Sequence, residues 1–267
     1  MTRRPAGDSI GERLQAEYFP ERIGPVRRIR RLLRFAITWL GLAWSRLSDD
    51  DEQIIEDLIS LGFCVGELGN LEGASRYFEQ AKSASAGTSY EAAGTRAACN
   101  LAAVSFRRQA WKEVVLELEP ELPRIRLLRN KQIVADAMRD LGIAYEKLGQ
   151  PGRALAMYEE SLTVSSAGGI DSRQALAKRN LGGLAYQEGH WEKARGKWAD
   201  SLEVFRRRKD ARGVAMMAYW LALALLQQHK VDAARTLFEE SCTVYTRLGL
   251  PDLAARSQAA IVKLSKP

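Results

Sequence analysis

The segment NLGGLAYQEGHWEKA, residues 180–194, gathers the side chains of this sequence that could do chemistry. Adjacent glycines suit a loop whose backbone N–H groups bind phosphate, and His190 suits a general base or a metal ligand. The surrounding sequence supports neither chemistry. The phosphate-loop pattern GxxxxGK[ST] is absent, and Gly182 and Gly183 fall inside a predicted helix with no strand before it. We therefore expect no nucleotide site here.

Histidine and cysteine, the other residues with catalytic or metal-binding potential, are sparse. The only histidines are His190 and His229, and each falls in a predicted turn without a cysteine or an acid at a ligand spacing. The patterns GxSxG and HExxH are also absent. The sequence predicts no catalytic residue, no metal site, no cofactor and a protein that is not an enzyme.

The composition is that of a protein with a real core. The chain has 267 residues, of which 46% are hydrophobic and 27% charged, enough for one large domain or two small ones. Three cysteines stand far apart, which argues against a disulfide framework and favours a reducing compartment such as the cytoplasm. No apolar run reaches the length of about 18 residues that a membrane span needs, and we expect no signal peptide.

Positive charge is concentrated at one end of the chain. Residues 1–47 carry ten arginines and four acids, a net charge of +6, which leaves +1 of the total +7 for the other 220 residues. General binding to nucleic acid through charge would therefore depend on this arm. Contact with nucleic acid is not expected, because no known binding motif accompanies the arginines.

The chain repeats itself with a period of 40 residues. A leucine recurs at that spacing and is followed each time by a small residue; the leucines are Leu61, Leu101, Leu141, Leu181 and Leu221. A large apolar residue recurs as well, as Phe78, Leu118, Tyr158, Trp198 and Phe238. A glycine that could end a helix stands between the two sets at Gly69, Gly149 and Gly189.

This pattern predicts pairs of antiparallel helices. The leucine and the small residue lie on the inward face of a first helix, and the small residue lets a second helix approach closely. A single hairpin cannot bury its own apolar faces, so consecutive hairpins must stack. A repeat of this kind is identified by its motif: residues 140–162, DLGIAYEKLGQPGRALAMYEESL, resemble the tetratricopeptide repeat. The 40-residue unit is similar to the repeats of kinesin light chains, of Pins/LGN adaptors and of Rap and PlcR peptide sensors.

The resemblance implies an all-α fold, a right-handed α-solenoid of five helical hairpins with a basic amphipathic helix before it and a capping helix after it. We expect an arm at 1–47, five repeats within 48–250 and a C-terminal capping helix at 251–267. The repeats are predicted at about 55–94, 95–134, 135–174, 175–214 and 215–250. Pro120 and Pro123 should kink or end the second helix of repeat two.

The helix predicted at 27–47 is amphipathic. Its apolar residues include Leu32, Leu33, Leu40 and Leu47, whereas Arg31, Arg34, Thr38 and Ser45 lie away from that face. One interpretation is a capping helix that covers the first repeat. The other is an interfacial helix that docks on a membrane surface or a membrane-protein complex. The docking residues would be Arg27, Arg28, Arg30, Arg31, Arg34, Phe35, Trp39 and Trp44.

In the tetratricopeptide class the first helices line a concave groove that holds partner segments. Asn100 and Asn180 directly precede the recurring leucine, and in the similar repeats an asparagine there holds the backbone of an extended peptide. An amide suits this role because it both donates and accepts hydrogen bonds. Repeat three has Asp140 and repeat five has Trp220 at this position, so the asparagine ladder is interrupted. The predicted groove residues are Arg96, Asn100, Arg107, Arg139, Asp140, Lys147, Arg179, Asn180, Tyr186 and Tyr219.

The predicted function is that of an interaction adaptor, scaffold or assembly factor. Its partner would be a protein or peptide, and the groove arginines favour acidic side chains or a free C-terminus. We expect a cytoplasmic protein, with a peripheral position on the membrane if the arm docks there. The alternative is a regulatory protein that senses a peptide and changes conformation when it binds.

Overall fold

The computed structural model describes the backbone of residues 25–264 and the side chains of residues 31–264. Every regular element in this range is an α-helix, and the helices follow one another as α2 (Pro25–Leu47), α3 (Asp51–Glu67), α4 (Leu71–Ser85), α5 (Glu91–Arg107), α6 (Trp111–Leu118), α7 (Leu122–Leu127), α8 (Lys131–Lys147), α9 (Pro151–Ala167), α10 (Asp171–Gln187), α11 (Trp191–Arg207), α12 (Ala211–Gln227), α13 (Val231–Arg247) and α14 (Pro251–Leu264). The predicted all-α solenoid fold is confirmed.

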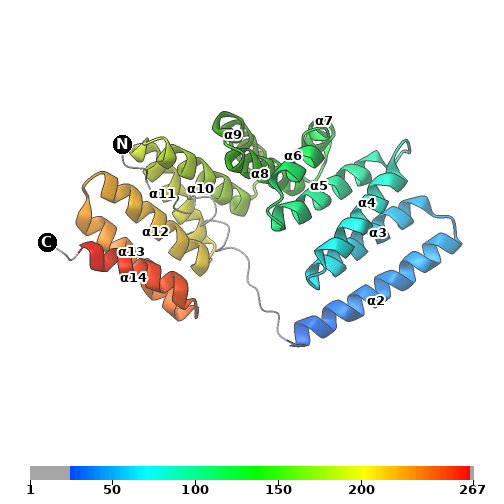
Figure 1. The fold of residues 1–267 in the computed structure, drawn as a ribbon, viewed down its shortest axis with the longest axis horizontal. Coiled ribbons are helices and arrows are strands. Elements are labelled where there is room, and N and C mark those ends of the chain that lie inside the picture. The colour runs from blue at the N-terminus through cyan, green and yellow to red at the C-terminus, as the bar shows by residue number, and fades with distance from the viewer. Residues whose placement is uncertain (1–24, 265–267) are drawn as a thin grey trace. The chain divides into compact units, whose positions relative to one another are not determined.

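The chain forms two compact units whose boundary falls within α9. Among the described residues, the N-terminal unit contains α2 to α8 and the C-terminal unit contains α10 to α14. Within each unit the helices pack against their neighbours in chain order, as the colours from blue α2 to red α14 show (Figure 1). The first helices of the hairpins are α3, α5, α8, α10 and α12, and the second helices are α4, the pair α6 and α7, α9, α11 and α13.

The recurring small residue makes room for the recurring aromatic ring. A Cβ atom on Gly62 would lie 2.5 Å from the ring of Phe78, and a Cβ atom on Gly182 would lie 2.5 Å from Nε1 of Trp198. Trp198 is fully buried, and its Nε1 donates a hydrogen bond of 2.9 Å to the carbonyl oxygen of Arg179. The glycines of the opening segment therefore serve helix packing.

The turn between the two helices of each hairpin uses a left-handed residue. At the same place in the 40-residue register stand Gly69, Gln109, Gly149, Gly189 and His229, with φ between 58° and 93°. Glycine adopts this conformation without steric cost, whereas glutamine and histidine do so with strain. His229 is thus an exposed turn residue, and His190 is the exposed residue that precedes α11.

Repeat two departs from the others at its prolines, as predicted. Its second helix ends at Leu118 and restarts as α7 at Leu122, with Pro123 in the first turn. Ile125 of α7 is fully buried and α7 packs against α8. The second helix is therefore divided in two, and its second part still packs on α8 with Ile125 buried.

Helix α2 packs against α3, but through the opposite face to the one that its apolar pattern suggested. Phe35 and Leu42 contact the core of the first repeat, and Ser45 is buried. The Oγ atom of Ser45 donates to Oδ2 of Asp57 at 2.9 Å. Leu32, Leu33, Leu40 and Leu47 are exposed. The orientation of α2 follows from its hydrogen bond to Asp57 on α3. The apolar pattern of α2 alone cannot predict a partner on another helix.

Helix α14 caps the C-terminal unit by packing on α13. Leu253, Ile261 and Leu264 are partly buried against the core, and the hydroxyls of Ser241 and Ser257 lie 3.0 Å apart. The guanidinium of Arg256 lies over the ring of Tyr219, 5.9 Å from the centroid.

Candidate functional site

The first helices of the N-terminal unit, α3, α5 and α8, pack in order, and α3 and α5 share polar contacts. Arg96 on α5 forms an ion pair with Glu56, which stands 40 residues earlier at the same register position on α3. Arg107 Nη1 donates to the carbonyl oxygen of Gly66 at 3.3 Å. Two of the predicted groove arginines therefore reach the preceding repeat.

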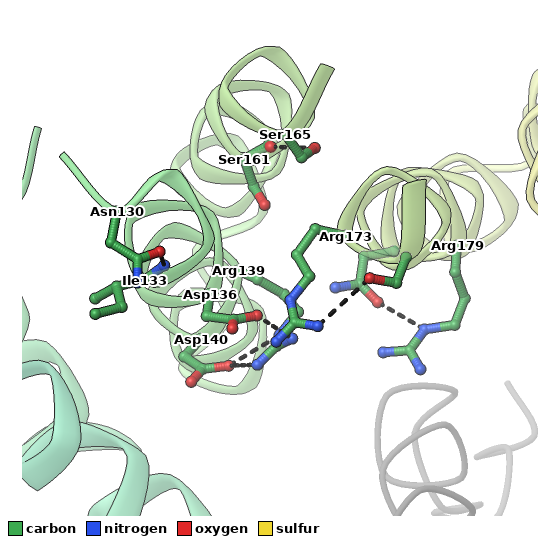
Figure 2. A network of polar contacts seen from close by, with 11 residues as sticks. Asn130, Ile133, Asp136, Arg139, Asp140, Ser161, Ser165, Arg173 and Arg179 are labelled. Carbon is green, nitrogen blue, oxygen red and sulfur yellow. Dashed lines mark hydrogen bonds and ion pairs between the residues drawn. The ribbon is translucent and has the colours of Figure 1, made fainter. Parts of the chain in front are cut away.

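Helix α8 places a cation between two acids. Arg139 Nη1 lies 2.7 Å from Oδ1 of Asp136, and its Nη2 lies 2.7 Å from Oδ1 of Asp140 (Figure 2). Asp140 stands at the register position that asparagine occupies in repeats two and four, and it is buried. The charge of Arg139 is offset within its own helix.

Asn100 on α5 is half-buried, beside the buried Cys99. Burial, with the nearby charges of Asp140 and Glu121 added, raises the pKa of the Cys99 thiol to about 12. The neutral thiol of Cys99 and the amide of Asn100 are adjacent uncharged polar groups on α5. The charge of Asp140 on α8 helps to keep the thiol protonated. Lys147 lies half-buried in the last turn of α8.

The C-terminal unit carries the second predicted asparagine. Arg179 and Asn180 on α10 are each only 4% exposed, although the sequence suggested an open polar face. Arg179 Nε donates to Oδ1 of Asn180 at 3.1 Å. The Nδ2 atom of Asn180 is buried and has no hydrogen-bond acceptor among the described residues. The amide is thus held at its oxygen end and unsatisfied at its nitrogen end.

Trp220 occupies the equivalent position on α12. Its ring is buried beside Trp198, with centroids 5.8 Å apart, and its Nε1 also has no acceptor among the residues that the structure describes. Buried N–H donors are nearly always paired in native proteins. Consecutive first helices of this unit therefore each present one unsatisfied donor at the same register position.

Two tyrosines on these helices are half-buried. The Oη atom of Tyr186 accepts a hydrogen bond from Nε2 of Gln227, one repeat later, at 3.3 Å. Its ring packs against Trp191 with centroids 4.8 Å apart, and burial raises the pKa of its hydroxyl. Tyr219 packs against Phe238, with centroids 5.3 Å apart. Both tyrosines are fixed by aromatic neighbours.

The predicted docking residues of the arm fall into two groups, those that contact the first repeat and those that are exposed. Arg31 Nη1 donates to the carbonyl oxygen of Glu67 at 2.6 Å, and Phe35 packs on the first repeat, so both hold α2 in place. Arg34, Trp39 and Trp44 are exposed. The side chains of Arg27, Arg28 and Arg30 lie outside the described residues.

Sequence reasoning missed the partners of several predicted residues. Glu56 and Gln227 stand 40 and 41 residues from their partners Arg96 and Tyr186. Their spacing was the available signal, because equivalent positions on consecutive first helices are neighbours. No group of three or more His, Cys, Asp or Glu residues able to hold a metal occurs among the described residues. None of the helices described is both long and apolar enough to cross a membrane.

Comparisons with known proteins agree with this architecture. The tetratricopeptide repeat family profile matches residues 134–166. No curated protein matches the sequence. Among solved structures, the apo form of RapI has a TM-score of 0.71 at 14% identity and covers 79% of this chain and 77% of its own.

Two further proteins show the same fold at low identity. The apo quorum sensor NprR from B. thuringiensis has a TM-score of 0.65 at 17% identity, over 96% of this chain and 76% of its own; NprR in complex with its cognate peptide NprX has a TM-score of 0.53. A kinesin light chain from Podosopora anserina with TPR-like repeats has a TM-score of 0.59 at 17% identity, over 73% of this chain and 96% of its own. One repeat of the chain, residues 134–166, thus matches the tetratricopeptide repeat family, and the chain as a whole shares the fold of tetratricopeptide repeat solenoids.

Proposed function

We propose that this protein is a non-enzymatic adaptor or assembly scaffold that binds an extended segment of a partner protein along its first helices. The observation that carries the proposal is the amide of Asn180, whose Nδ2 is buried without an acceptor while its Oδ1 is fixed by Arg179. A backbone carbonyl of a bound segment would supply the missing acceptor. An unsatisfied buried donor costs about 1–3 kcal/mol, so its pairing favours the bound state.

Trp220 extends this recognition by one repeat. Its indole N–H is a donor only, so it can pair with a carbonyl but not with a peptide N–H. Asn180 and Trp220 are 4% and 1% exposed, so the carbonyls of a segment could pair with them only if α10 and α12 open locally when it binds. Trp220, which interrupts the row of asparagines in the sequence, would then supply an indole N–H donor where repeats two and four supply an amide.

The charges of the first helices bear on the partner's composition. The sequence favours a partner with acidic side chains or a free C-terminus. However, Glu56 offsets Arg96, and Asp136 and Asp140 offset Arg139. We therefore infer that the segment bound along α5 and α8 is polar and close to neutral. The cytoplasm is its proposed location, in keeping with three free cysteines.

A second candidate function is peptide sensing. The fold likeness to NprR, which has been solved with its cognate peptide, favours it. A sensor would change conformation when a peptide binds, so small-angle scattering should report compaction on addition of a genuine ligand. A ligand that binds without any change in the scattering profile would leave the adaptor as the better account.

Affinity capture tests the proposed function. Immobilised wild-type protein, N180A, N100A and the control Q80A would be exposed to soluble and detergent-solubilised extracts, and bound proteins would be identified by mass spectrometry. Gln80 is an exposed amide on the second helix α4, so its removal leaves the first helices intact. We expect partners that Q80A retains and N180A loses, with unchanged helix content. Partners retained equally by all four proteins would contradict the proposal.

A further inference from the structure

The outer face of α2 is apolar and exposed. Its large side chains include Ile37, Leu40, Trp44 and Leu47, of which Trp44 is 74% and Leu47 83% exposed. Viewed down the helix axis, the apolar side chains form one arc with Trp39 at one edge and Ile37 at the other. This arc covers about 160° of the circumference, at 100° per residue. Monomeric proteins seldom expose so continuous an apolar surface without a use for it.

This face is not the unfilled core side of a missing repeat. In the 40-residue register, α2 aligns with the second helix α4, and Ser45 and its equivalent Ser85 are both buried. Trp39 and Leu40 then correspond to Glu79 and Gln80, which are exposed on α4. The same positions carry Glu159 and Glu160 on α9 and Glu239 and Glu240 on α13. Apolar residues on α2 therefore replace the polar outer surface of an ordinary second helix.

Charge favours one occupant for this face. Between residues 31 and 47 the sequence has no acid, and Arg34 and Arg46 are exposed on either side of the apolar arc. A second copy of the chain would bring arginine against arginine with no acid to pair, which disfavours helix–helix docking. An anionic lipid surface complements both arginines, and tryptophan suits the interface between headgroups and acyl chains.

We propose that α2 is an interfacial membrane anchor that lies on an anionic phospholipid surface with Trp39, Leu40 and Trp44 inserted and Arg34 and Arg46 at the headgroups. The inner face of α2 is fixed on α3 by the hydrogen bond from Ser45 to Asp57 and by the contact of Arg31 with Glu67. The helix is therefore formed and oriented before it meets the bilayer. This inference is independent of the proposed binding along the first helices.

Vesicle flotation with the full chain tests the anchor. Wild-type protein, L40Q/W44A and the control L116Q would be mixed with vesicles of phosphatidylcholine alone or with added phosphatidylglycerol. The double variant installs the residues that α4 carries at these positions, Gln80 and Ala84. Leu116 is 73% exposed on α6, so L116Q removes a comparable apolar side chain elsewhere.

We expect wild-type protein and L116Q to float with the phosphatidylglycerol vesicles, and L40Q/W44A to bind about tenfold more weakly. R34Q/R46Q should lose the preference for the anionic vesicles. Wild-type protein that stays off these vesicles would overturn the proposal, as would binding that L40Q/W44A leaves unchanged. A wild-type dimer that L40Q/W44A converts to a monomer in analytical ultracentrifugation would assign the face to self-association and also overturn it.

Discussion

Ser45 and Asp57 form a buried hydrogen bond of 2.9 Å that joins α2 to the first helix of the first repeat. The second oxygen of Asp57 accepts from Nε2 of Gln53, also at 2.9 Å, so the carboxylate is held at both ends. This contact decides which face of α2 turns inward.

Replacement of Ser45 by alanine should destabilise the N-terminal unit. Oδ2 of Asp57 would lose its only described side-chain donor while buried, at a cost of about 1–3 kcal/mol in the free energy of unfolding. Urea unfolding followed by circular dichroism measures this change. S48A is the matched control, because Ser48 is exposed and bonds only to backbone carbonyls of its own helix. Equal stability of S45A and S48A would contradict the account.

Gly182 should tolerate no side chain. A methyl group there would collide with the buried indole of Trp198, and overpacking of this kind costs about 1–3 kcal/mol. Gly196 on the following helix is the control, because a Cβ atom there meets nothing within 4 Å. Thermal unfolding should show G182A less stable than wild type and G196A more stable by about 0.5–1 kcal/mol, the helix preference for alanine. A stable G182A would show that the glycine does not serve packing.

His229 should be replaceable by glycine with a gain in stability. Its φ of 58° strains a histidine but not a glycine. The strain energy that glycine removes from the folded state should exceed the entropic cost of a more flexible unfolded chain, for a net gain of about 0.5 kcal/mol in the free energy of unfolding. H190G is the control, since His190 has a φ of −84° and glycine relieves no strain there. Denaturant midpoints of the two variants, compared with wild type, measure the difference. A loss of stability in H229G would imply that the imidazole makes a contact of its own.

Glu117 should make stability depend on pH. Burial raises the pKa of its carboxyl from 4.5 to about 7, while its hydrogen bond from Ser105 partly opposes the shift. The folded state therefore favours the protonated acid. The contribution of Glu117 is fully present below pH 4.5 and is lost as the pH rises through about 7. Unfolding in urea at several pH values should show wild type losing stability relative to E117Q across this range; parallel curves would exclude the effect.

The sequence predicts the hairpins better than it predicts the surfaces. Leu61 and Gly62 recur with their equivalents because each repeat faces the same packing problem, so the fold can be read from the spacing alone. The indole of Trp198 on α11 donates to the backbone carbonyl oxygen of Arg179 on α10, and Ser45 on α2 donates to Asp57 on α3. These contacts join different helices, and a helical wheel of one segment contains no information about them.

Site-specific photo-crosslinking tests the central claim most directly. A benzophenone amino acid would replace Tyr186, which lies on α10 with Asn180, or the control Tyr77 on α4, and the full chain would be irradiated in cell extract. Tyr77 is a half-buried tyrosine on a second helix. The account predicts that Tyr186, and not Tyr77, gives a crosslinked partner, and that N180A abolishes this product. A partner captured from Tyr77 alone, or from Tyr186 regardless of N180A, would show that the first helices do not hold the partner through Asn180.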